Sequence, residues 1–241
     1  MIGIGTILNA VGILIGGILG LLLRRQLTLP TQVAIKNGLG VLVIFVGLKT
    51  TWDNLGGGGW LILKQVTIVV LALTLGRLTG RLLHLQKGLN RLGQHAKERF
   101  AKSSPQQPNR WSEGFITCSL LFCVGPMAIL GALQDGLTGR WQVLGAKALM
   151  DGLATMAFVG TFGWGAICSV IPVVAYQGSI TLGAKFLAPY VGDTALMASI
   201  NATGGLLVFC IALIILNLKK IELADYLPSL AMAPLITWLW K

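Results

Sequence analysis

Two aspartates lie within long apolar stretches of the sequence, where a charged side chain is least expected. Asp151 falls inside the run from Ala148 to Val159, and Asp135 ends the run that begins at Leu120. An ionisable group inside a bilayer costs about 2.5–3.5 kcal/mol or more unless it meets a partner or a water-filled cavity. The chain has only eight acidic residues, so these two positions predict a site that binds an ion or a small solute.

Each aspartate also has a structural interpretation, which the sequence leaves open. Lys147 lies four residues before Asp151, and residues at this spacing share one face of a helix. The two could therefore form a local ion pair, or Asp151 could serve as a cation or proton site. Asp135, preceded by Gln134, could bind a solute or cap the end of a helix at the membrane surface.

Uncharged polar residues within the apolar stretches complete the candidate site. Amide side chains offer an oxygen to a cation and an N–H group to an anion, although hydrogen bonding between helices is their commoner use. The segment Tyr176–Thr181 places a glycine and four hydrogen-bonding side chains in an apolar stretch, which predicts a discontinuous helix with exposed backbone groups. Besides the two aspartates, the candidate solute-binding residues are Gln134, Gln177, Ser179, Asn9, Asn37, Asn201, Thr117 and Ser119.

The composition predicts that these residues belong to a membrane protein. Of the 241 residues, 54% are hydrophobic and 11% are charged, whereas soluble domains carry about 25% charged residues. The net charge of +11 comes from lysines and arginines that cluster between the apolar stretches. Such charges are typical of cytoplasmic loops near anionic lipids, so membrane lipids are expected partners and nucleic acid is not.

Sequence signatures of enzymes and metal sites are missing. The chain contains no GxSxG, GxxxxGK[ST] or HExxH motif, and its four cysteines form no CxxC pair. Both histidines, His84 and His95, lie in a polar segment away from the cysteines. We therefore expect no enzymatic activity, no metal site and no cofactor, and we interpret the cysteines as packing residues.

Eight apolar stretches approach the length of about 20 residues that a membrane-spanning helix needs. Pro126 predicts a kink in the fourth stretch, and Pro228 and Pro234 predict a kink or a re-entrant segment in the eighth. The fifth and sixth are joined only by residues 160–163, so seven spans is the alternative. The predicted fold is an all-α polytopic bundle in one domain, 1–241, with spans at Ile4–Leu23, Val33–Trp52, Trp60–Leu83, Gly114–Leu133, Ala146–Phe162, Trp164–Phe186, Ala195–Leu218 and Leu223–Trp240.

The basic residues indicate the orientation of these spans. With the N-terminus outside, the inside loops carry 13 of the 19 lysines and arginines, as the positive-inside rule requires. The segment Met1–Gly3 has no positive charge, which argues against a signal peptide. The polar linker 84–112 is then cytoplasmic, and its first half is either an amphipathic helix on the membrane surface or a solvated connector.

Two further patterns concern the arrangement of the helices. Glycine-rich helices that begin at Asn37 and Asn201 follow the first and the sixth span, and a third span follows each. Five spans separate the starts of the two copies, which favours an inverted repeat of spans one to three and six to eight, as in many transporters. Glycines at positions 12, 16 and 20, and at 76 and 80, predict close helix packing within the monomer or in a homo-oligomer.

Several blocks of the sequence resemble a known family. Gly5–Asn9, Gly114–Gly125, Gly131–Gly139 and Tyr176–Leu182 are similar to the corresponding blocks of the prokaryotic "domain of unknown function 554" membrane proteins, the YqgA/YdfK-like group. The resemblance covers essentially the whole chain, although Pro126 stands where a small residue is expected. It implies a multi-pass protein of the prokaryotic inner membrane, often labelled a transporter, with no established substrate.

The sequence thus predicts a transporter of a small solute or ion. The alternative is a membrane scaffold, or a module that binds lipid or a partner protein through its basic linker. A water-accessible polar cavity would favour transport, whereas a dry interior with Asp151 paired to Lys147 would favour the module.

Overall fold

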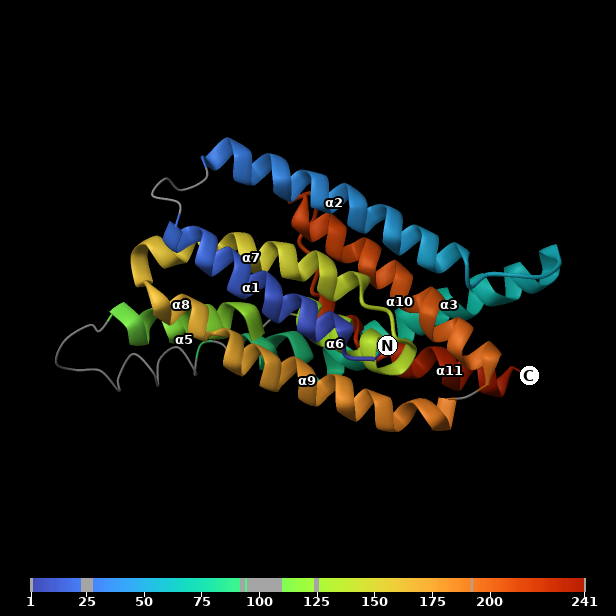
Figure 1. The fold of residues 1–241 in the computed structure, drawn as a ribbon. Helices are drawn as coiled ribbons and strands as arrows, with labels where there is room; N and C mark the ends of the chain where they lie inside the picture. The colour runs from blue at the N-terminus through green and yellow to red at the C-terminus, as the bar shows by residue number, and fades with distance from the viewer. Residues whose placement is uncertain are drawn as a thin grey trace. The chain divides into compact units, whose positions relative to one another are not determined.

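The computed structural model describes residues 2–22, 28–91, 94, 110–123, 126–191 and 193–240, and every regular element in these ranges is helical (Figure 1). The short 3-10 helices η1 (Ala188–Val191) and η2 (Leu223–Tyr226) precede α10 and α11. The all-α prediction is confirmed by the α-helices α1 (Ile4–Leu22), α2 (Leu29–Trp52), α3 (Gly59–Leu82), α5 (Arg110–Cys123), α6 (Pro126–Thr138), α7 (Gln142–Phe162), α8 (Trp164–Cys168), α9 (Val170–Leu187), α10 (Thr194–Ile215) and α11 (Ser229–Leu239).

The long helices agree with the prediction of a membrane protein, although not with every predicted span. Five of them are long and apolar enough to cross a bilayer: α1, α3, α7, α8 together with α9, and α10. A sixth span results if α5 and α6 cross as one bent pair. The segments Asn37–Trp52 and Leu223–Leu239 are apolar but shorter, so the number of eight spans stays a prediction.

Two predicted interruptions lie beside boundaries between helical elements. The axes of α5 and α6 differ by 60°, next to the kink that the sequence predicts at Pro126. The last apolar stretch is divided into η2 and α11 around Pro228, while α11 continues through Pro234.

The discontinuity predicted for Tyr176–Thr181 is wrong, because α9 runs unbroken through it. The hydroxyl of Ser179 donates to the carbonyl of Tyr176 in the preceding turn, at 2.8 Å, so this polar side chain is satisfied without opening the helix. The interruption lies earlier, at Ser169 between α8 and α9.

Apart from residue 94, only the two ends of the predicted linker 84–112 are described, and its last residues, 110–112, already belong to α5. Residues 85–91 are helical, in agreement with a helix in the first half of the linker. Residues 92–93 and 95–109 lie outside the described residues.

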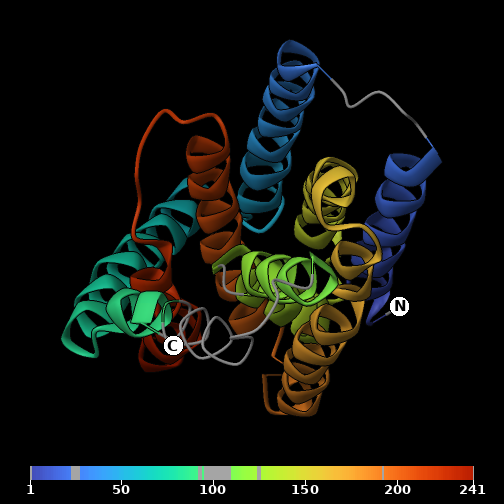
Figure 2. The same cartoon turned by 90° about the vertical axis from the view of Figure 1, so that its left-hand side faces the viewer.

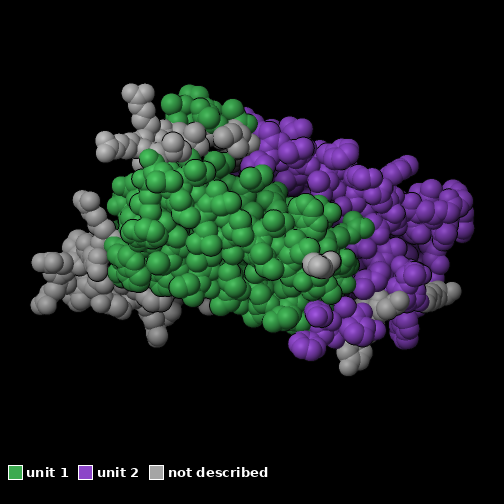
Figure 3. All heavy atoms as spheres, viewed as in Figure 1, with its two compact units in different colours: residues 1–35, 89–184 green, residues 36–88, 185–241 purple. Residues whose placement is uncertain are grey.

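The chain forms two compact units, which Figure 3 colours separately. The first comprises residues 1–35 and 89–184, and the second comprises residues 36–88 and 185–241. Each unit therefore combines segments that are far apart in the sequence.

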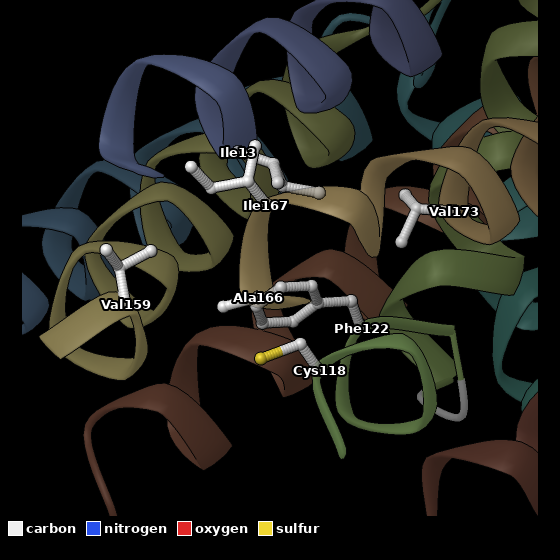
Figure 4. Close-up of a cluster of buried hydrophobic side chains, with 7 residues drawn as sticks. All are labelled: Ile13, Cys118, Phe122, Val159, Ala166, Ile167 and Val173. Atoms are coloured by element: carbon white, nitrogen blue, oxygen red, sulfur yellow. The ribbon is translucent and has the colours of Figure 1, made fainter. Parts of the chain in front are cut away.

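In the first unit, α1 packs along α7, and α5 packs against α7 and α8. Buried apolar side chains from five helices meet there (Figure 4). Because these helices contribute to one core, they hold the polar side chains of α1, α7 and α9 in fixed positions. The core consists of Ile13, Cys118, Phe122, Val159, Ala166, Ile167 and Val173.

In the second unit, α3 lies beside α11, and α10 packs against both (Figure 2). Gly76 and Gly80 allow the closest approach: a Cβ atom on Gly76 would lie 2.5 Å from the backbone nitrogen of Ser229, and one on Gly80 would overlap the carbonyl of Asp225. The close packing predicted for this glycine pair is therefore confirmed within the monomer.

Candidate functional site

A glycine stripe on α1 brings this helix into backbone contact with α7. Side chains at these positions would overlap the backbone of α7, so only glycine permits the approach. The contacts advance by four residues on both helices, which shows that α1 and α7 run parallel. Gly12, Gly16 and Gly20 face the backbone carbonyls of Ala148, Gly152 and Met156, respectively.

Lys147 and Asp151 form a buried ion pair on the face of α7 that this packing covers. The ammonium of Lys147 donates to both carboxylate oxygens of Asp151, at 2.8 Å and 2.6 Å. Each side chain is only 8% exposed. The ring of Phe122, with its centroid 5.8 Å from Nζ, lies against the ammonium, so both charges are removed from bulk solvent and depend on each other.

Two amides from other helices extend this pair into a network. Asn9 of α1 donates from Nδ2 to Asp151 Oδ2 at 3.1 Å, and also to Gln177 Oε1 of α9 at 3.2 Å. Both amide residues are fully buried. The site therefore joins α1, α7 and α9 through polar groups within an apolar unit.

The network leaves one acceptor and one donor unused. Asn9 Oδ1 and Gln177 Nε2 are buried and make no hydrogen bond. Turning the Asn9 amide over would place its oxygen against the Asp151 carboxylate, and turning Gln177 would oppose two N–H donors, so the amide orientations follow from their neighbours. A buried polar atom without a partner costs about 1–3 kcal/mol, and this cost would be relieved by a ligand that accepts from Gln177 and donates to Asn9.

Two threonines that are not among the predicted solute-binding residues lie beside the network. The hydroxyls of Thr6 and Thr181 are 3.4 Å apart, and Thr181 also donates to the carbonyl of Ala132 at 3.3 Å. Thr6 precedes Asn9 by three residues and Thr181 follows Gln177 by four, so helical spacing could have found both. From Thr6 to Asn9 the residue numbers on α1 increase, while those of their partners on α9 decrease from Thr181 to Gln177. The two helices are therefore antiparallel.

Asp135 has a structural role in this unit. Its carboxylate accepts from the backbone N–H of Gly3 at 3.2 Å and of Gly5 at 3.0 Å, at the start of α1. An N-terminal helix end carries unpaired N–H groups and a partial positive charge, so a carboxylate stabilises it. Of the two interpretations of Asp135, the helix cap is the one that the contacts match, although the helix belongs to a distant part of the sequence.

The other predicted residues of the first unit do not join the network. Gln134 is buried beside Asp135, and Ser119 donates to the carbonyl of Phe115 one turn earlier, at 2.5 Å. Thr117 and Ser179 are exposed.

The two remaining candidates, Asn37 and Asn201, belong to the second unit. Asn37 is exposed on α2. Asn201 donates from Nδ2 to Asn54 Oδ1, in the turn that follows α2, at 3.2 Å, so its amide is used in a contact between two segments of the unit. Within the described residues, no group of His, Cys, Asp and Glu side chains has the geometry to hold a metal ion.

A known protein family matches the part of the chain that contains the helices of this site. The family described as "Protein of unknown function (DUF554)" matches residues 4–238. The chain belongs to this family. The resemblance seen in the sequence blocks is therefore confirmed.

Two relatives extend over nearly the whole chain. "Uncharacterized membrane protein YdfK" of Bacillus subtilis (strain 168) is 28% identical over 232 residues, which cover 96% of this chain and 94% of the relative. "Uncharacterized protein YqgA" of Escherichia coli (strain K12) is 29% identical over 240 residues, which cover 98% and 97%. No solved structure matches the chain. Together with the apolar helices, these matches show a helical membrane protein of a family of unknown function.

Proposed function

We propose that this protein transports a small polar solute or an ion across the prokaryotic inner membrane, with the network around Asp151 as its binding site. The observation that carries the proposal is the buried Lys147–Asp151 pair linked to two amides that retain an unused acceptor and an unused donor. Asn9 and Gln177 then orient the solute, and the two charged groups bind its ionic parts. No catalytic step is part of this function.

The depth of the site supports this role. Asp151 follows the start of α7 at Gln142 by nine residues and precedes its end at Phe162 by eleven. At 1.5 Å per residue, the carboxylate lies about 14 Å and about 17 Å from the two helix ends. Substrate sites of secondary transporters lie at this depth, close to the midplane of the bilayer.

Contacts between α1–α3 and α8–α11 support an inverted repeat of these segments, and with it the same interpretation. Each helix of one copy contacts its counterpart in the other copy, and each pair is antiparallel. Asn9 of α1 meets Gln177 of α9, Thr51 of α2 donates to the carbonyl of Ala202 of α10 at 3.2 Å, and Gly76 of α3 meets Ser229 of α11. Antiparallel contact between counterparts is the relation that an in-plane twofold axis produces.

The direction of α7 supports eight spans. Because α7 runs parallel to α1, the chain must cross an even number of times between the start of α1 and the start of α7. Crossings by α1, α2, α3 and the bent pair α5–α6 satisfy this condition, whereas a re-entrant α5–α6 would reverse α7. The positive-inside rule then favours an N-terminus outside.

Transport is tested with the wild-type protein reconstituted into proteoliposomes. We would measure uptake of radiolabelled glycine, L-alanine and L-lactate, and fluxes of H⁺, Na⁺ and K⁺ with fluorescent indicators. The matched variant is Lys147→Met/Asp151→Leu, which removes both charges and keeps the apolar volume. A flux that the wild type shows and the folded double variant lacks supports the proposal, and an equal flux in both removes the pair from the mechanism.

A non-transporting membrane module is the second candidate, and one observation favours it. Asp151 accepts two hydrogen bonds from Lys147 and one from Asn9, so the carboxylate is satisfied without a ligand. A scaffold would use this network only to lock α1, α7 and α9 together. The two functions differ in the accessibility of Gln177 to water, which a scaffold does not require.

A further inference from the structure

A second polar site lies in the second unit, at the end of α3 that faces away from Gly59. It is a cavity of about 210 Å³, smaller than the roughly 300–1,000 Å³ of pockets for drug-sized ligands. Its volume therefore suits a molecular fragment such as a lipid headgroup. The lining residues are Arg81, His84, Gln86, Lys87, Glu222 and Asp225.

Hydrogen bonds between two distant segments form the wall of this cleft. The backbone N–H of Gln86 donates to Asp225 Oδ1 at 2.8 Å, and the backbone N–H of Ala224 donates to Gln86 Oε1 at 3.1 Å. The guanidinium of Arg77 lies 5.5 Å from the ring centroid of Tyr226, a cation–π contact that ties α3 to η2. These contacts hold the segments around Gln86 and Asp225 together at the cleft.

The position of the cleft places it at the level of the lipid headgroups. Arg81 lies in the last turn of α3, a helix long enough to span a bilayer, and His84 and Lys87 follow its end. Basic residues at the end of a span meet the phosphate layer of the membrane. In the orientation proposed above, this is the cytoplasmic leaflet.

The lining carries both signs of charge. Arg81 and Lys87 are exposed cations, and Glu222 is an exposed carboxylate on the α10–η2 connection. The carboxylate of Asp225 is buried and already engaged with Gln86. Arginine and lysine bind phosphate oxygens, and a carboxylate pairs with an ammonium that carries N–H donors.

We propose that this cleft binds a phosphate ester that carries a primary ammonium, as in the phosphoethanolamine headgroup. Arg81 and Lys87 bind the phosphate, and Glu222 binds the ammonium. A purely anionic headgroup would leave Glu222 facing a like charge, and a trimethylated ammonium would offer it no N–H donor. The same chemistry occurs in a lipid and in a soluble phosphate ester, so the test must separate the two sources.

The test is native mass spectrometry of the purified full-length protein in detergent. Dioleoyl phosphatidylethanolamine, phosphatidylcholine and phosphatidylglycerol are added separately, and O-phosphoethanolamine is added as a competitor. The variants are Arg81→Gln and Glu222→Gln, both at exposed positions, so that folding is preserved. The control is Lys64→Gln, a basic residue near the other end of α3.

Phosphatidylethanolamine binding is expected to fall about tenfold in each cleft variant, the effect of losing one charge-assisted hydrogen bond, and to stay unchanged in the control. Competition by O-phosphoethanolamine at equal concentration would identify a soluble ester as the ligand, and lack of competition would identify the lipid. Equal binding of phosphatidylglycerol with no effect of Glu222→Gln would overturn the proposal, as would unchanged phosphatidylethanolamine binding in both variants.

Discussion

Removing one charge of the Lys147–Asp151 pair should destabilise the protein more than removing both. The two side chains are each 8% exposed, so a single substitution leaves the other charge buried among apolar neighbours. Breaking a buried pair costs about 3–5 kcal/mol, whereas replacing it by apolar residues of similar volume is often neutral. We therefore expect Lys147→Met and Asp151→Leu each to lose about 3–5 kcal/mol, and the double variant to lose less than either.

A second lysine–aspartate pair in the chain provides a matched control for this comparison of single and double variants. Lys49 and Asp53 have the same spacing and are 3.2 Å apart, but their side chains are 59% and 47% exposed. The same substitutions there should show a coupling below about 1 kcal/mol. Such exposed pairs are screened by solvent and contribute little.

The assay is unfolding by sodium dodecyl sulfate in mixed micelles, followed by the fluorescence of the seven tryptophans. The quantity of interest is the coupling free energy from the double-mutant cycle. A double variant that is as unstable as the sum of the single variants would refute the reasoning. It would mean that the two charges do not depend on each other in the folded protein.

Three further substitutions probe the packing and the polar groups around this pair. Gly16→Ala should lose about 1–3 kcal/mol in the same assay, because its Cβ would overlap the carbonyl of Gly152. The control Gly183→Ala, whose Cβ would have nothing within 4 Å, should be neutral or stabilising by up to about 1 kcal/mol. Equal effects of the two substitutions would contradict the α1–α7 contact. Asp135→Ala should lose about 0.5–2 kcal/mol as the start of α1 loses its cap, and an unchanged melting temperature would contradict that role. Gln177→Met removes a buried N–H donor that has no partner but also the acceptor of one Asn9 N–H group, so it should change the melting temperature only slightly, yet abolish transport; a retained flux would exclude Gln177 from the site.

Contacts along one helix could be predicted from the sequence. The spacing of Lys147 and Asp151 implies a shared helical face, and the structure has them as an ion pair. The glycine stripe of α1 likewise implied close packing, because a repeat of four residues places small side chains in one row. Such inferences need only the geometry of a single helix.

Contacts between distant segments could not be predicted. Asn9 and Gln177 are separated by 168 positions, and apolar helices of similar composition offer many alternative pairings. Asp135 was noticed for its charge, but its partners are backbone N–H groups at Gly3 and Gly5, which have no signature in the side-chain sequence. Ser179 was selected as a polar residue in an apolar stretch, but its hydroxyl forms a hydrogen bond within its own helix. The sequence does not distinguish such a residue from one that faces a ligand.

The central claim, that the Asp151 network lies on a solute pathway, is tested most directly by the accessibility of Gln177 to water. The four cysteines would first be replaced by alanine, and Gln177→Cys would be introduced into that background. Val173→Cys, one turn earlier on α9 in the apolar core, is the control. Vesicles of both orientations would then be treated with a membrane-impermeant methanethiosulfonate reagent.

A pathway with alternating access predicts that the thiol at position 177 is modified from both sides of the membrane, while the thiol at position 173 is modified from neither. If the thiol at position 177 reacts only after denaturation, the network is a dry structural element, and the transport proposal is contradicted.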